Sequence, residues 1–63
     1  SQGYRVTIEF IGLNFRIHAL PEQYARSGRL SFFIDDSLML RAADHKGGRA
    51  HEGDEEYTGD FNS

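Results

Sequence analysis

Residues 4–19 read YRVTIEFIGLNFRIHA, and apolar and polar side chains alternate through both halves of this stretch. When the chain folds back at Ile11-Gly12, apolar residues of the two halves face each other. The facing pairs are Phe10 with Leu13, Ile8 with Phe15, Val6 with Ile17, and Tyr4 with Ala19. A slip of one residue would set apolar side chains opposite polar ones, so the pattern favours one register. The stretch therefore predicts an antiparallel hairpin whose apolar face points toward the core.

A short helix is predicted directly after this hairpin, within Leu20–Gly28. Pro21 suits the first helical position, and Glu22 suits the positive end of the helix dipole. Gly28 suits the residue just past the end of a helix. Leu20 and Tyr24 are four residues apart and would share the buried side of this helix.

A second hairpin is predicted from Arg29 to Ala43, with Asp35-Asp36-Ser37 as its loop, because Asp and Ser side chains bond locally to the backbone in turns. The facing pairs in this register are Ile34 with Leu38, Phe32 with Leu40, and Leu30 with Ala42. The helix-favouring residues of Ser37–Ala43 indicate a helical turn as the alternative. We favour the strand.

The predicted fold class is therefore α+β, a small four-stranded antiparallel sheet in ββαββ order with one short helix. An SH3-like small β-barrel is the alternative way to close the sheet. Residues 1–43 form the predicted domain. Residues 44–63 contain four of the seven glycines and six acidic side chains, with only Ala50, Tyr57 and Phe61 as apolar members. Such a segment buries too little surface to offset its ordering entropy, so it is predicted to be a flexible, disordered acidic tail.

Composition limits the class of protein. Sixty-three residues make one domain, and the absence of cysteine excludes disulfides and thiolate zinc sites. No apolar run approaches the length of a membrane span and no signal peptide is visible, so a cytoplasmic location is expected. Residues 1–43 carry five arginines against four acids, whereas residues 44–63 carry two basic and six acidic side chains. General affinity for nucleic acid is not expected from a net charge of −3.

The chain offers little that could carry catalysis or bind a cofactor. It has no glycine-rich phosphate loop and no cysteine nucleophile, and a chain of this length has little volume for a pocket. Potential metal ligands gather in the tail, at His45, His51, Glu52 and Asp54. They lie in a glycine-rich stretch with no rigid element to fix their geometry. We therefore expect no enzyme activity, no cofactor and no built metal site.

The polar face of the first hairpin carries the alternative function. In the predicted register Arg5 lies opposite His18, and Thr7 lies opposite Arg16. Together with Arg41, these basic residues could contact phosphates, as sheet-based nucleic-acid binders do. No exposed aromatic pair accompanies them as a base-stacking platform, so nucleic-acid binding is the second hypothesis.

The preferred hypothesis is a non-enzymatic protein-binding or regulatory module. Phe33 and Met39 lie opposite each other on the face that a single helix would leave uncovered, flanked by Arg41. Aromatic, Met and Arg side chains are enriched in interface cores. Tyr57 and Phe61 form a second candidate motif, two aromatic rings in an acidic background. We expect binding through an exposed sheet face or edge, to another protein or to a second copy as a homodimer.

Overall fold

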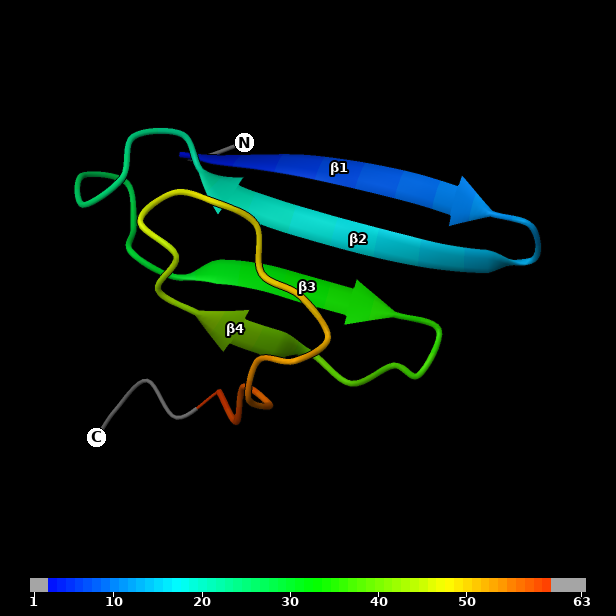
Figure 1. Cartoon of the computed structure of the whole chain (residues 1–63). Coiled ribbons are helices and arrows are strands. Elements are labelled where there is room, and N and C mark those ends of the chain that lie inside the picture. Colours follow the sequence, from blue (N-terminus) through cyan, green and yellow to red (C-terminus); the bar gives the residue numbers. More distant parts are fainter. Residues whose placement is uncertain (1–2, 60–63) are drawn as a thin grey trace.

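The computed structural model describes residues 3–59 and contains one antiparallel sheet of four strands. The strands are β1 (Tyr4–Ile11), β2 (Asn14–Pro21), β3 (Ser31–Asp35) and β4 (Arg41–Ala43), and they neighbour one another in chain order. Figure 1 shows this open sheet, with β1 and β4 at its two edges. The described residues therefore do not form the small barrel that was the alternative prediction.

The predicted helix is wrong: residues 3–59 contain strands and turns but no helix. β2 continues through Pro21, which pairs with Tyr4, so the proline ends a strand and does not begin a helix. After it, Ala25 has φ 71°, and its N–H bonds to the carbonyl of Gly28. A positive φ cannot continue a right-handed helix, and a helix of two turns is in any case costly to nucleate. The described residues include no helix long and apolar enough to cross a membrane.

Both hairpins form, each in a register two residues away from the predicted one. Phe10 pairs with Phe15 and Ile8 with Ile17, so the first loop is Gly12-Leu13. Gly12 takes φ 60°, the conformation that a type II′ turn requires at its first central position. A shift of two residues keeps every side chain on its predicted face.

The second hairpin has a longer loop than predicted. Phe33 pairs with Arg41, not with Met39, and residues 36–40 connect the strands. The carboxylate of Asp35 accepts hydrogen bonds from the N–H and the hydroxyl of Ser37, at 3.0 and 2.6 Å. Leu38, with φ 65°, donates its N–H to the carbonyl of Asp35 at 2.9 Å. These local bonds hold Met39 outside β4.

Residues 44–54, called the covering segment below, lie across the sheet (Figure 1, yellow to orange). Ala50 is buried, the hydroxyl of Ser31 donates to the carbonyl of Gly48, and an Arg41 guanidinium N–H donates to the carbonyl of Asp54 at 2.7 Å. The sequence predicts that this segment belongs to a flexible acidic tail, disordered when free, whereas the structure packs it on the sheet. The segment has too few apolar side chains to be held by hydrophobic burial. Polar contacts to β3 and β4 hold it on the sheet instead.

Candidate functional site

The face that the sequence marks as the core is open. Its members in β1, Val6, Ile8 and Phe10, are 57%, 55% and 78% exposed, and Leu13 in the adjoining turn is fully exposed. The remaining members are Phe15, Ile17 and Ala19 of β2, Phe32 and Ile34 of β3, and Ala42 of β4. None of these side chains is charged. We call this surface the open apolar face.

Aromatic rings cover one end of this face. The Phe32 ring lies 5.9 Å from the Tyr4 ring and 5.2 Å, edge to face, from the Tyr57 ring. Tyr57 also donates its backbone N–H to the carbonyl of Leu40. Tyr57, predicted as part of a tail motif, therefore packs on the sheet, and its proposed companion Phe61 lies outside the described residues. The apolar surface that stays exposed is at the β1 side.

The opposite face is the covered one, which reverses the predicted core. Phe33 is only 3% exposed and His18 only 6%, and the two rings lie 5.2 Å apart. The expected exposed patch of Phe33 and Met39 is therefore not present, because the covering segment lies over Phe33. The helix that would have covered the other face does not form.

His18 lies in this interior with few polar neighbours. Its Nε2 lies 3.7 Å from Oε1 of Glu9, and its Nδ1 has no hydrogen-bond partner among residues 3–59. Desolvation by burial, aided by the charge of Arg49, lowers the pKa of His18 below its ordinary value, although Glu9 opposes the shift. Of the residues predicted to bind nucleic acid, Arg5 and Arg16 are exposed, but His18 is not.

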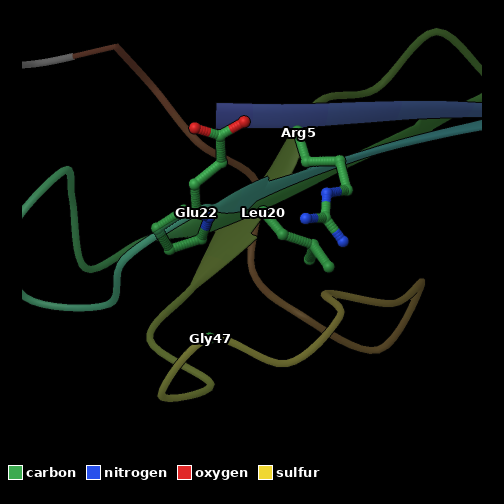
Figure 2. A pocket seen from close by; sticks show the side chains of 5 residues that line it. Arg5, Leu20, Glu22 and Gly47 are labelled. Atoms are coloured by element: carbon green, nitrogen blue, oxygen red, sulfur yellow. The ribbon is translucent and has the colours of Figure 1, made fainter. Parts of the chain in front are cut away.

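Hollows of a few hundred Å³ lie on the covered face. The one in Figure 2 has a volume of about 210 Å³, and the side chains of Arg5 and Leu20 point toward the loop that contains Gly47. The carboxylate of Glu22 points the other way. A second hollow of about 280 Å³ is lined by Arg16, His18, Phe33, His51 and Glu52. In neither does a nucleophile contact a base.

The two edges of the sheet differ. Residues 55–57 lie along the outer edge of β4, where Arg41 bridges to Glu56 and the Ala42 N–H bonds to the carbonyl of Glu55 at 3.2 Å. Within residues 3–59 no strand lies along the outer edge of β1. The part of this edge from Val6 to Phe10 lies beside the exposed part of the open apolar face.

Three potential metal ligands converge in the covering segment. One ligand atom from each of His45, His51 and Asp54 lies within 4.8 Å of the others. Asp54 Oδ2 is 2.7 Å from His45 Nε2 and accepts the His51 N–H at 2.9 Å. Partial burial acts to raise the pKa of Asp54, but these hydrogen bonds and the nearby imidazoles hold it below its ordinary value. In the sequence these three residues, with Glu52, are potential ligands, and no built site is expected. The sequence does not predict the turns that bring the three side chains together.

Comparison with known proteins found no matching family model, curated protein or solved structure.

Proposed function

We propose that this chain is a non-enzymatic protein-binding module whose partner is a second copy of itself, joined through the outer edge of β1. The observation that carries the proposal is the exposure of Val6, Ile8 and Phe10 on a strand that has no neighbouring strand on its outer side within residues 3–59. A long, apolar, unprotected edge strand is a template for pairing with another chain. The opposite charges of Arg5 and Glu9 favour a second copy of this chain as the partner.

The backbone of β1 supports such pairing. Ile11 and Asn14 flank the two-residue loop and form the hydrogen-bonded pair next to it. Hydrogen-bonded and non-hydrogen-bonded pairs alternate along an antiparallel ladder. The N–H and C=O groups of Phe10, Ile8 and Val6 therefore point away from β2, toward the outer edge.

The side chains on the two sides of Thr7 are complementary to each other. Arg5 and Glu9 lie two residues on either side of it, and Val6 and Ile8 lie one residue on either side. When two copies pair antiparallel about Thr7, Arg5 of each copy faces Glu9 of the other. Val6 faces Ile8 in the same way. Opposite charges and β-branched pairs directly across strands each contribute roughly 0.2–1 kcal/mol.

Other registers lose this complementarity. A shift of two residues sets Arg5 or Glu9 opposite Thr7, and a shift of four sets Arg5 opposite Arg5 or Glu9 opposite Glu9. A shift of one residue sets apolar side chains opposite polar ones. Glu9 now accepts a hydrogen bond from exposed Arg49 at 3.4 Å, and a surface pair of this kind contributes little. Glu9 can therefore turn to a second copy at small cost.

The test uses charge reversal. Arg5→Glu sets acid against acid, and Glu9→Arg sets base against base, so each variant alone should dimerise at least roughly tenfold more weakly than the original chain. Mixed together, the two variants regain both opposite-charge pairs and should form a heterodimer. Arg26→Glu, an exposed arginine in the 22–30 loop, is the matched control and should leave association unchanged. Light scattering at several concentrations measures the original chain, the three variants and the mixture.

Amide hydrogen exchange locates the interface. The Val6, Ile8 and Phe10 amides should gain protection as concentration rises, while the Thr7 amide, which faces β2, should change little. A chain that stays monomeric at high concentration would overturn the proposal. The outer edge of β1 would then be a candidate for pairing with a different polypeptide. Dimers that ignore both charge reversals would place the interface elsewhere, for instance on the open apolar face.

A further inference from the structure

The covering segment also contains side chains that the proposed dimer does not use. Its histidines and Asp54 lie close together although the segment contains no regular strand or helix. We propose that His45, His51 and Asp54 bind one divalent transition-metal ion of the zinc class, which holds the covering segment closed over the sheet.

The ligand types select this class of ion. Two imidazoles and one carboxylate suit zinc and neighbouring first-row metals, whereas magnesium and calcium prefer oxygen ligands throughout. Three protein ligands also leave a fourth tetrahedral position, which a water molecule can take.

The distances fit a small rearrangement. Zinc bonds of about 2.0–2.2 Å in a tetrahedron separate neighbouring ligand atoms by about 3.3 Å. Asp54 Oδ2 now lies 2.7 Å from His45 Nε2, and Asp54 Oδ1 lies 3.7 Å from His51 Nε2. These two separations involve different oxygens of Asp54, and one ligand atom of each residue lies within 4.8 Å of the others, so the ligand atoms have to move by up to about 1.5 Å. An ion bound here would replace the hydrogen bond between His45 and Asp54.

Two turns and a strand contact supply the frame that the sequence did not reveal. The carbonyl of His45 accepts the Gly48 N–H and that of His51 accepts the Asp54 N–H, each at 3.0 Å. The carbonyl of Asp54 is bound by Arg41 of β4. Each histidine thus begins a tight turn, and the second turn ends at the carboxylate. Little ordering remains to be done when the ion binds.

One existing contact has to change. The Gly53 N–H donates to Nδ1 of His51 at 3.2 Å, so in the present tautomer the proton lies on Nε2. Binding through Nε2 moves that proton to Nδ1 and removes this contact. The contact is long and exposed, so its loss is a minor cost.

The experiment titrates the whole chain with Zn²⁺ at a fixed neutral pH. We expect one ion per chain by calorimetry, the visible absorption of tetrahedral Co²⁺ on substitution, and a Tm increase on the order of 10 °C at a hundredfold excess over Kd. Mg²⁺ should change nothing. Binding of several ions without saturation at one would overturn the proposal.

Variants separate a built site from general attraction to an acidic segment. His51→Gln alters a side chain that is 62% exposed, so it should leave the fold intact and weaken Zn²⁺ binding at least tenfold. Glu52→Gln removes the neighbouring exposed carboxylate and is the matched control, with unchanged affinity expected. Equal weakening by both variants would show that the ion binds diffusely. Circular dichroism without metal verifies that each variant folds.

Discussion

His18 and Phe33 are cross-strand partners in β2 and β3, and their ring centroids lie 5.2 Å apart on the covered face. A titratable ring thus occupies the small interior beside its largest apolar side chain. Protonation would place a charge there, and for this reason the pKa of His18 is lowered, first by desolvation and then by the charge of Arg49.

Stability should therefore fall in mild acid. In the unfolded chain His18 takes up a proton near its ordinary pKa of about 6.5, whereas in the folded chain it stays neutral to lower pH. The unfolded state binds more protons in that window, so the free energy of unfolding decreases as pH falls below about 6.5. It levels off below the folded-state pKa. Thermal denaturation between about pH 8 and 5 measures the slope.

The variant His18→Leu should flatten this pH dependence, and His51→Gln, at an exposed histidine, should retain it. An unchanged slope in His18→Leu would assign the acid sensitivity to other groups.

Phe33 and Met39 should differ sharply on truncation. Phe33→Ala empties the centre of the covered interior and should cost about 3–5 kcal/mol. A domain of this size has little more than that in total stability, so the variant should be largely unfolded. Met39→Ala alters a half-buried loop residue and should cost distinctly less. Urea denaturation followed by circular dichroism compares them, and equal losses would contradict the placement of Phe33 in the interior.

Gly12 and Gly28 should resist substitution for different reasons. Gly12 has open space around it but φ 60°, so Gly12→Ala should cost about 1–2 kcal/mol through backbone strain alone. At Gly28 an added methyl group would overlap the Tyr4 hydroxyl, which donates to the carbonyl of Leu30 at 2.9 Å. Gly28→Ala should therefore displace the Tyr4 ring.

A double-mutant cycle distinguishes the two mechanisms. Tyr4→Phe should recover part of the stability lost in Gly28→Ala, since it removes the nearest clashing atom. The same change should recover nothing in Gly12→Ala. Additive losses in both pairs would contradict the steric explanation at Gly28.

The strands were predictable because their signal is local. Alternation with period two marked β1, β2 and β3 and the face of each side chain, and both registers missed by two residues, which preserves the faces. The conformations of the turn residues explain the error of two residues in each register. Gly12, and not Ile11, occupies the first position of the first loop. The second loop is longer than predicted because Asp35 and Ser37 form local hydrogen bonds.

Part of the candidate site was also readable. The symmetry of Arg5 and Glu9 about Thr7 is visible in the letters, and so are the metal-type ligands at His45, His51 and Asp54. The sequence predicts phosphate contact for Arg5 and no built metal site, because the edge position of β1 and the two turns that bring the ligands together are not visible in the letters.

By itself the sequence determined the strands, their antiparallel order and the division of side chains between two faces, because these follow from neighbours along the chain. Only the tertiary structure decided which face is covered. That choice depends on contacts between residues far apart, such as Ser31 with Gly48 and Arg41 with Asp54, which draw a polar segment over Phe33 and leave Val6, Ile8 and Phe10 exposed. Hydrophobic patterning records that a face is apolar, and it carries no information about what reaches that face.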